Sequence, residues 1–438
     1  MFMQEGIKIA IIGAGSTYSP ELMEGFINHK NDIPLKELYL MDIDDRKLDI
    51  VGGLCQRMFK HAEMDTDVVL TKDLDLALKG ASFVCAQIRV GKLPARVKDE
   101  KIPAKYGLLG QETNGIGGFF KGLRTIPVIL DICKRMEKLC PDAWLINFSN
   151  PSGMIAEAVL NNSPIKMIGL CNVPINSVDS VKRQLNLPKE AFVEYMGLNH
   201  LAWITKVEYQ GKDYLEEAIK EGINSGNMKN IPTLGFSKEL IATCGAIPTS
   251  YLNYYYHKDK MVDKAIHAEK CRGEVCMEIE EQLLQIYSNS EVNTKPELLS
   301  KRGGARYSEV AINLIDAIYN DRQNIQVVNI LNHGAMPFLA DNDAVEISAV
   351  VGKDGAKPIP IDPKFHNQSI IELIKTIKNY EKHAVKAAMT GDVHEAMYAL
   401  MINPLVFDYD KAYDCFFELL EAHREYLPQF KDAKKVEN

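Results

Sequence analysis

The sequence lacks any apolar run as long as a membrane-spanning helix needs, which is about 20 residues. Its N-terminus also lacks the layout of a signal peptide. There is no excess of basic residues, because 51 Lys and Arg stand against 59 Asp and Glu and give a formal net charge of −8. This balance argues against nucleic acid or an anionic membrane as the main partner. We therefore expect a soluble protein.

The cysteines lack the pairing pattern of a disulfide framework. There are nine of them, an odd number, and they are scattered without regular spacing. Such usage is typical of reduced thiols in a cytoplasm, and we expect that compartment.

The chain also lacks a Pro-, Gly- or Ser-rich linker and internal repeats. Its 438 residues, 46% hydrophobic and 25% charged, are more than one compact core usually holds. We expect two large domains that share a broad interface, with the functional site in the cleft between them.

Short apolar runs alternate with amphipathic stretches over the first 170 residues, which predicts a parallel sheet covered by helices on both faces. The predicted strands are 7–12, 37–42, 66–70, 82–88, 143–148 and 165–170, with helices at 44–62 and 124–140. After residue 171 the pattern changes to a strand pair, a long helix over 263–288, strands at 324–331 and 344–352, and closing helices. The fold class is therefore α/β: a Rossmann-type, doubly wound domain at 1–170 and an α+β domain at 171–438.

A glycine turn follows the first predicted strand, in "IAIIGAGSTYSPEL" (9–22). Gly13 and Gly15 permit a tight turn, and a helix begins near Pro20, so backbone N–H groups can meet a pyrophosphate. Tyr18 occupies the place of the third glycine of the usual fingerprint. Asp42 ends the second strand, 27 residues after Gly15, where a carboxylate can bind a ribose diol. We expect a dinucleotide site rather than a plain glycine turn.

A basic stretch and a polar strand end follow. Six cations lie within the 17 positions from Arg89 to Lys105, ahead of a Gly- and Asn-rich loop. They suit an anionic or polyhydroxylated ligand, although a charge run is more often a solvated helix face. The strand at 143–148 leads into Asn147, Ser149 and Asn150, which point into the ligand crevice of a parallel sheet.

Three further residues stay ambiguous from the residues alone. Cys171 reads first as a packed core thiol, and His200 as a satisfied histidine at a strand end. Tyr251 has no advantage over the nearby tyrosines Tyr254, Tyr255 and Tyr256.

Seven motifs occur in order: "GAGSTYSPEL", "RVGK", "KYGLLGQETNG", "LINFSNP", "GLCNVP", "GLNH" and "PTSYLNYY". Together, from residue 7 to beyond 330, they resemble glycoside hydrolase family four, the NAD- and metal-dependent glycosidases. The Cys171-Asn172 pair resembles the 6-phospho-β-glucosidase branch, since the α-specific enzymes carry an acid directly after the cysteine. The resemblance implies a C-terminal domain of the lactate dehydrogenase-like type and a homodimer or homotetramer.

The resemblance also implies roles for single residues. Cys171 and His200 would ligate a divalent metal, which by resemblance is manganese. A thiolate together with an imidazole more often binds zinc. Tyr251 would be the base, and Glu112 would raise its basicity. Residues assigned to NAD are Gly13, Gly15, Ser16, Thr17 and Asp42. Those assigned to the substrate by resemblance are Arg96, Asn150 and Arg272. Arg89 and Asn172 are added as substrate-binding residues because of the chemistry of their side chains.

The implied reaction is hydrolysis of a phosphorylated β-glucoside such as cellobiose 6-phosphate. NAD takes hydride from C3 of the sugar, a base removes the C2 proton, the aglycone leaves, water adds, and NADH returns the hydride. NAD-dependent glycosidases of this kind depart from the usual two-carboxylate mechanism. Asn172 cannot donate a proton as a general acid, so the donor to the leaving group is unassigned. Other sugar or anomeric specificity, a hydroxy acid dehydrogenase and a non-catalytic dinucleotide sensor are the alternatives.

Overall fold

The computed structural model describes residues 6–226, 231, 234–302 and 306–436. Among these residues, no helix combines the length and the apolar character that crossing a bilayer requires. The strands of the described part join into one 13-stranded sheet, in the order β10-β8-β7-β12-β11-β6-β5-β4-β1-β2-β3, with β13 paired to β12 and β9 to β8.

The first half of the chain forms the parallel part of this sheet, and all six predicted strands are confirmed. They are β1 (Ile7–Ile12), β2 (Leu35–Met41), β3 (Asp67–Thr71), β4 (Phe83–Ala86), β5 (Trp144–Asn147) and β6 (Lys166–Gly169). The helices between them are α1 (Ser19–Asn28), α2 (Asp45–His61), α3 (Leu74–Leu78), α4 (Lys92–Lys105), α5 (Gly115–Leu139) and α6 (Ser152–Asn162). Apolar side chains on consecutive strand positions are buried, because helices cover both faces.

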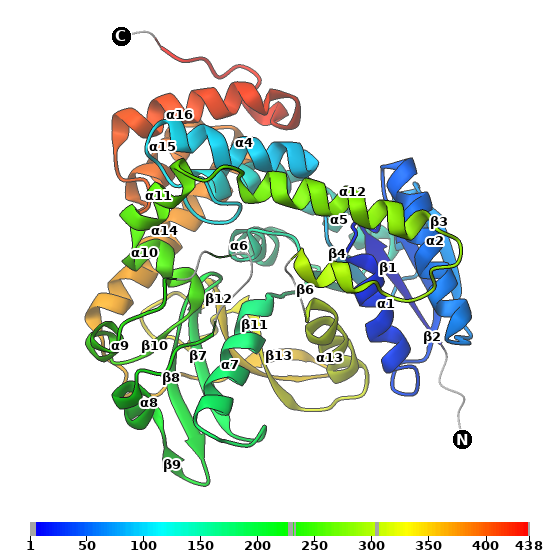
Figure 1. The fold of residues 1–438 in the computed structure, drawn as a ribbon, viewed down its shortest axis with the longest axis horizontal. Coiled ribbons are helices and arrows are strands. Elements are labelled where there is room, and N and C mark those ends of the chain that lie inside the picture. Colours follow the sequence, from blue (N-terminus) through cyan, green and yellow to red (C-terminus); the bar gives the residue numbers. More distant parts are fainter. Residues whose placement is uncertain (1–5, 227–230, 232–233, 303–305, 437–438) are drawn as a thin grey trace.

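The second half extends the sheet with antiparallel strands and adds most of the remaining helices (Figure 1). Its strands are β7 (Phe192–Leu198), β8 (Leu201–Tyr209), β9 (Lys212–Asp213), β10 (Ile247–Pro248), β11 (Asn324–Leu331), β12 (Ala344–Gly352) and β13 (Gly355–Pro358). Its helices begin with α7 (Asn172–Gln184), α8 (Leu215–Glu221), α9 (Lys238–Cys244), the 3-10 turn η1 (Ser250–Leu252), α10 (Asn253–Tyr256), α11 (Lys258–Ile266) and α12 (Arg272–Ser288). They continue with η2 (Glu297–Lys301), α13 (Tyr307–Tyr319), α14 (Gln368–Thr390), α15 (Val393–Ile402), α16 (Tyr409–Ala422), η3 (Arg424–Tyr426) and η4 (Pro428–Phe430).

Two predicted helices differ from the structure. The single helix expected over 263–288 is wrong, because α11 ends at Ile266 and α12 begins at Arg272. The cause is a capping box, in which the Cys271 side chain accepts from the N3 backbone and Glu274 accepts from the Cys271 N–H (2.9 Å). Helix α5 begins at Gly115 rather than near residue 124, so the predicted glycine loop is partly helical.

The sheet also bears on the domain division. Strand β11 comes late in the chain but pairs with β6, so the sheet runs on without a break past residue 170. The division into domains 1–170 and 171–438 stays a prediction.

A buried ion pair fixes the helix that carries the basic stretch. Arg124 on α5 donates to both carboxylate oxygens of Asp99 on α4, at 2.9 and 2.6 Å, and both side chains are almost fully buried. Arg124 holds the pKa of Asp99 below its usual range against the opposing effect of burial. Helix α12 lies against both α4 and α2 and connects the two regions (Figure 1).

Candidate active site

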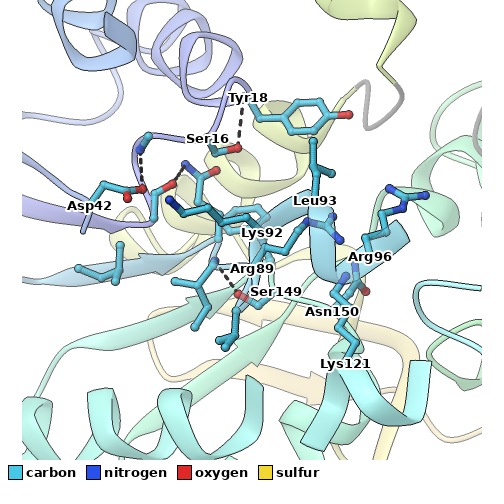
Figure 2. A pocket seen from close by; sticks show the side chains of 18 of the residues that line it. Ser16, Tyr18, Asp42, Arg89, Lys92, Leu93, Arg96, Lys121, Ser149 and Asn150 are labelled. Atoms are coloured by element: carbon cyan, nitrogen blue, oxygen red, sulfur yellow. Dashed lines mark hydrogen bonds between the residues drawn. The ribbon is translucent and has the colours of Figure 1, made fainter. Parts of the chain in front are cut away.

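A cavity of about 660 Å³ opens at the carboxyl ends of the parallel strands, within the size range of small-molecule sites. Residues from both halves of the chain line it. From the first half come Gly13, Gly15, Ser16, Tyr18, Asp42, Arg89, Arg96, Glu112, Lys121 and Asn150, and from the second half Asn172, His200, Tyr251, Arg302 and Tyr307. Figure 2 shows the part of this wall that carries the predicted dinucleotide turn and the basic stretch.

The glycine turn has the geometry that its sequence predicts. Gly13 has a φ of +88°, and a Cβ there would lie 2.9 Å from the Gln87 carbonyl oxygen, so both the conformation and the space require glycine. A Cβ on Gly15 would lie 2.9 Å from the Asp42 carboxylate. The turn therefore leaves an open backbone surface on the cavity wall.

Asp42 joins this turn to the second strand. One carboxylate oxygen accepts the Gly15 N–H (2.8 Å) and the other accepts the Asp44 N–H (2.9 Å), which fixes the side chain (Figure 2). Ser16 also lines the cavity, whereas Thr17 is fully buried and is not among the lining residues.

The polar residues after β5 fall into two groups. Asn147 is fully buried and donates to the Ser149 carbonyl oxygen (3.0 Å), so it shapes the loop. Ser149 and Asn150 line the cavity, and the Ser149 hydroxyl accepts the Ile88 N–H (2.9 Å). The predicted strand end thus brings Asn150 to the cavity.

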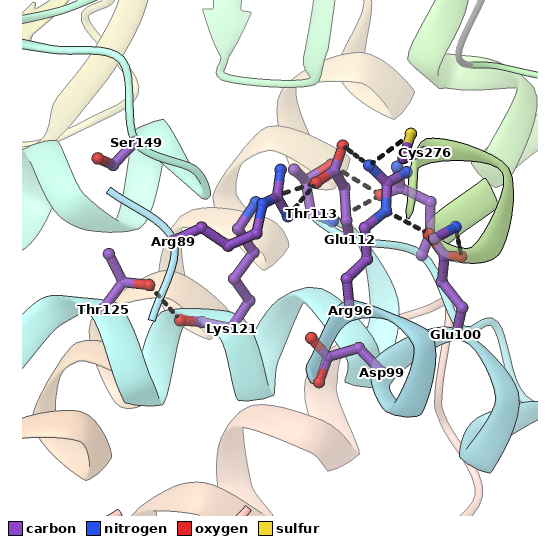
Figure 3. Close-up of polar contacts among 12 residues, drawn as sticks. Arg89, Arg96, Asp99, Glu100, Glu112, Thr113, Lys121, Thr125, Ser149 and Cys276 are labelled. Atoms are coloured by element: carbon purple, nitrogen blue, oxygen red, sulfur yellow. Dashed lines mark hydrogen bonds and ion pairs between the residues drawn. The ribbon is translucent and has the colours of Figure 1, made fainter. Parts of the chain in front are cut away.

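Glu112 is surrounded by three cations (Figure 3). Its carboxylate lies 2.7 Å from Arg89 Nη1, 3.1 Å from Arg96 Nη1 and 3.1 Å from Lys121 Nζ. Burial favours the neutral acid, but Arg96, Lys121 and Arg89 outweigh it and hold the pKa of Glu112 well below its usual range. Glu112 is therefore a buried anion.

The basic stretch is only partly a solvated helix face. Arg96 is buried, and its Nε lies 2.7 Å from Glu100 in addition to the Glu112 contact. By contrast, Lys98, Lys101 and Lys105 point away from the cavity, to the Ala422 carbonyl oxygen, Glu274 and Glu418 respectively.

Cys171 and His200 meet at the start of α7 and the turn between β7 and β8. Their Sγ and Nε2 atoms are 3.5 Å apart and both side chains are buried. Burial lowers the pKa of His200 to about 3 and raises the pKa of the Cys171 thiol. The imidazole is therefore neutral with a lone pair available, while the thiol must lose its proton to bind a metal.

The spacing of these two atoms can be compared with that of a metal site. A sulfur and an imidazole nitrogen on one metal, at the bond lengths of about 2.3 and 2.1 Å that zinc takes, lie roughly 3.1 Å apart at a right angle and roughly 3.6 Å apart at the tetrahedral angle. The described residues contain no cluster of three or more His, Cys, Asp or Glu side chains able to hold a metal. Cys171 and His200 could therefore supply two ligands of a metal ion and leave its other coordination positions open.

Tyr251 lies directly on the imidazole of His200. The ring centroids are 3.7 Å apart and the planes differ by 7°. Burial, followed by the Glu112 charge, raises the pKa of the Tyr251 phenol well above its usual range. Tyr251 lines the cavity, whereas the neighbouring Tyr254, Tyr255 and Tyr256 are not among the lining residues. The sequence offers no reason to prefer one of these four tyrosines as the base. In the fold, Tyr251 is the one of the four that lines the cavity.

Arg272 lies elsewhere. Its Nη2 donates to the carbonyl oxygens of Lys301 (3.3 Å) and Arg302 (2.6 Å), and it is not among the lining residues. Sequence reasoning passed over Lys121, Arg302 and Tyr307, which do line the cavity. A signal for Lys121 existed, because a lysine inside the apolar run "GGFFKGL" is unusual.

A second buried carboxyl lies on β12, behind the site. Glu346 is fully buried and accepts from Asn199 (2.9 Å), Asn329 (3.1 Å) and Tyr195 (3.1 Å). Burial raises the pKa of Glu346 to about 7, from an ordinary value of 4.5. The group is neutral in slightly acidic solution.

This shift predicts a pH dependence of stability. Between pH 4.5 and 7 the unfolded chain ionises Glu346 and the folded chain does not, so the contribution present below pH 4.5 is lost by pH 7. The loss is about 3 kcal/mol in the free energy of unfolding. In urea unfolding of cofactor-free protein, Glu346→Gln should lack this loss, whereas the exposed control Glu221→Gln should retain it. Parallel pH profiles for all three proteins would contradict the shift.

Residues 8–187 match the model of the family 4 glycosyl hydrolases, and residues 195–406 match the model of that family's C-terminal domain. The chain therefore belongs to the family 4 glycosyl hydrolases, which confirms the resemblance predicted from its motifs. As a member it is a glycosidase, which favours this prediction over the dehydrogenase and sensor alternatives.

Similar proteins lie within the same family. A probable 6-phospho-β-glucosidase of Bacillus subtilis (strain 168) is 45% identical, over 98% of this chain and 99% of the relative. The 6-phospho-β-glucosidase of Escherichia coli (strain K12) is 42% identical over 98% of both. The solved 6-phospho-β-glucosidase of Thermotoga maritima with manganese, NAD⁺ and glucose 6-phosphate has a TM-score of 0.86 and 34% identity, over 96% of this chain and 99% of that one.

A more distant likeness concerns the fold alone. Lactate dehydrogenase of Eimeria maxima, at 14% identity, has a TM-score of 0.55 over 89% of this chain and 97% of its own. The predicted fold class, a Rossmann-type sheet with a lactate dehydrogenase-like second part, is confirmed.

Proposed function

We propose that this chain is a 6-phospho-β-glucosidase that uses NAD and a divalent metal, manganese, to hydrolyse phosphorylated β-glucosides such as cellobiose 6-phosphate. The relatives at 45% and 42% identity bear the name 6-phospho-β-glucosidase. Asn172 at the start of α7 matches the β-specific branch. The assignment includes a cytoplasmic location, proposed from the scattered cysteines, and a homodimer or homotetramer, proposed from family resemblance.

One observation carries the proposal: the glycine turn, His200 and Tyr251 line a single cavity, and Cys171, which is not itself a lining residue, contacts His200 from behind the wall. Bound NAD supplies reversible hydride transfer at a sugar carbon, and a divalent metal supplies a Lewis acid. The chain must then bind both, hold the sugar between them and move one proton.

The dinucleotide would lie against Gly13, Gly15 and Ser16, with Thr17 buried behind them. A Cβ at Gly13 would collide with the Gln87 backbone and one at Gly15 with the Asp42 side chain, so this form of the turn requires both glycines. Each Asp42 oxygen accepts one backbone N–H and keeps a further lone pair, so the carboxylate can also accept from ribose hydroxyls.

The metal would take Cys171 and His200 as its protein ligands. Their 3.5 Å separation and the neutral imidazole fit this role. Vicinal oxygens of the sugar would fill open positions.

Tyr251 would accept the C2 proton of the sugar. Burial makes its phenol hard to ionise, and a cation bound at His200, against which its ring is stacked, would offset this cost. The negative charge of Glu112 makes the phenolate more basic once formed, which supports the role proposed for Glu112.

Polar groups around the cavity would hold the substrate. Arg96, Arg89, Asn150 and Asn172 line the wall and offer charged or amide donors. Arg272, also assigned to the substrate from its motif, would act through the backbone that it holds. Asn172 has no acidic proton, so water would protonate the leaving group, or the aglycone would leave unassisted.

The test compares four chromogenic substrates, the α- and β-glucosides with and without a 6-phosphate, in the presence of NAD and manganese. The phosphorylated β-glucoside should be cleaved roughly 10²-fold faster than its unphosphorylated form, because charge-assisted contacts to phosphate are lost in the latter. NADH should not accumulate in proportion to product. Faster cleavage of the phosphorylated α-glucoside would contradict the proposed β-specificity. Formation of one NADH for each product molecule would instead favour the dehydrogenase alternative.

A further inference from the structure

The geometry points to Arg302 as an anion-binding residue of the cavity, which contacts a phosphate group carried either by the dinucleotide or by the sugar substrate. The inference rests on the proposed function and adds to it a residue that the sequence motifs do not assign. It assigns Arg272 the part of a positioning residue.

The first observation is an unsatisfied donor. Arg302 follows η2, lines the cavity and is 8% exposed. Its Nη1 is buried and has no hydrogen-bond partner among the described residues. A buried charged donor without a partner is costly, so this N–H group has capacity for an acceptor that enters the cavity.

The second observation is that the guanidinium is held in place from two sides. Its carbon lies 4.8 Å from the ring centroid of Tyr18, on the glycine turn. Its Nη2 lies 3.2 Å from Glu280 on α12. A guanidinium fixed in this way loses little freedom when it binds an anion.

The local charge also favours an anion. Glu280 pairs with Lys47 on α2 as well as with Arg302, so two cations share one carboxylate. Glu21, another carboxylate on this part of the wall, accepts the Arg306 N–H (2.9 Å). The Arg302–Glu280–Lys47 group thus carries one uncompensated positive charge.

The other cations deep in the cavity are already engaged. Arg96 is shared between Glu100 and Glu112, and Arg89 and Lys121 both contact Glu112. In Arg302, by contrast, the buried Nη1 has no acceptor among the described residues. A phosphate oxygen would satisfy it with a charge-assisted hydrogen bond.

Arg272 braces this arrangement. Its Nη2 donates to the Arg302 carbonyl oxygen (2.6 Å) and to that of Lys301 (3.3 Å), which ties the backbone of Arg302 to the first turn of α12. Arg272 would therefore affect phosphate binding through Arg302 rather than by contact.

Calorimetric titration of the full-length protein tests the inference. Dissociation constants are measured for NAD, and for glucose 6-phosphate with NAD and manganese present. In Arg302→Gln the constant should rise roughly 10- to 100-fold for one of the two ligands, with Arg302→Lys in between. A rise for NAD alone assigns the dinucleotide pyrophosphate, and a rise for glucose 6-phosphate alone assigns the sugar phosphate. Arg272→Gln should weaken the same ligand less.

The exposed Arg322→Gln, which loses a surface pair with Asp316, is the matched control and should bind both ligands as wild type does. Constants within twofold of wild type for both ligands in Arg302→Gln would overturn the inference. The inference would also be overturned if Arg302→Gln and Arg302→Lys both weakened the binding of NAD and of glucose 6-phosphate equally and lowered the melting temperature. That result would mark a structural role for Arg302. If Arg302→Gln does not fold, Arg302→Lys decides by the same criteria. Wild-type protein that binds neither ligand would instead refute the proposed function.

Discussion

Tyr251→Phe should lower turnover by roughly 10²–10⁴, the usual contribution of a positioned acid–base group. The substitution keeps the ring that stacks at 3.7 Å on His200 and removes only the hydroxyl. Binding of NAD and metal should stay near the wild-type level, because neither proposed ligand set includes this oxygen. Exchange of the C2 hydrogen with deuterated solvent should fall in step with turnover, and enzyme-bound NADH should appear on mixing with substrate.

Tyr254→Phe is the matched control. Tyr254 is also buried and its ring centroid lies 5.9 Å from that of Tyr251, but it does not line the cavity. Its variant should keep turnover within a few-fold of wild type. C2 exchange at the wild-type rate in Tyr251→Phe would mean that another group is the base, and Tyr255 would be the next to replace.

Removal of NAD and metal should abolish activity. Protein gel-filtered in the presence of a chelator should lose roughly 10³-fold or more, because a Lewis acid supplies several kcal/mol to such a reaction. NAD and manganese added together should restore activity, and either one alone should not. A preparation shown free of both that keeps full activity would refute the redox mechanism.

Cys171→Ser sharpens this experiment. A serine hydroxyl stays neutral, whereas the thiol next to His200 can lose its proton and bind the metal as an anion, so the manganese concentration needed for half-maximal activity should rise, while affinity for NAD should not change. Cys133→Ser, at a buried thiol on α5 outside the cavity lining, should leave the manganese requirement unchanged.

Much of the fold is readable from local sequence. The central parallel strands β1, β4 and β5 are nearly continuous apolar runs because helices cover both of their faces, and such runs are visible without any structure. The break between α11 and α12 was missed because it depends on Cys271, a residue type seldom expected to cap a helix. The pairing of β11 with β6 was also missed, because no local pattern reports a contact across so many residues.

The site divides in the same way. Gly13, Gly15 and Asp42 belong to a motif with a physical reason for each position, and their geometry follows it. The pairing of Cys171 with His200 came from family resemblance, since spacing alone favoured a core thiol and a satisfied histidine. The role proposed for Arg302 could not be predicted from the sequence, because it rests on a buried nitrogen without a partner among the described residues, which only side-chain packing reveals.

The pairing of β11 with β6 has a consequence for synthesis of the chain. Strand β6 has no partner on its outer side until β11 has left the ribosome, about 160 residues later. At ordinary rates of translation that interval lasts roughly 8–30 s, during which an unpaired strand edge is exposed on a nascent chain that already holds the whole parallel sheet. Chains interrupted between these two strands would expose at β6 an edge that β11 covers in the full-length protein, so we expect them to aggregate or to be captured by chaperones.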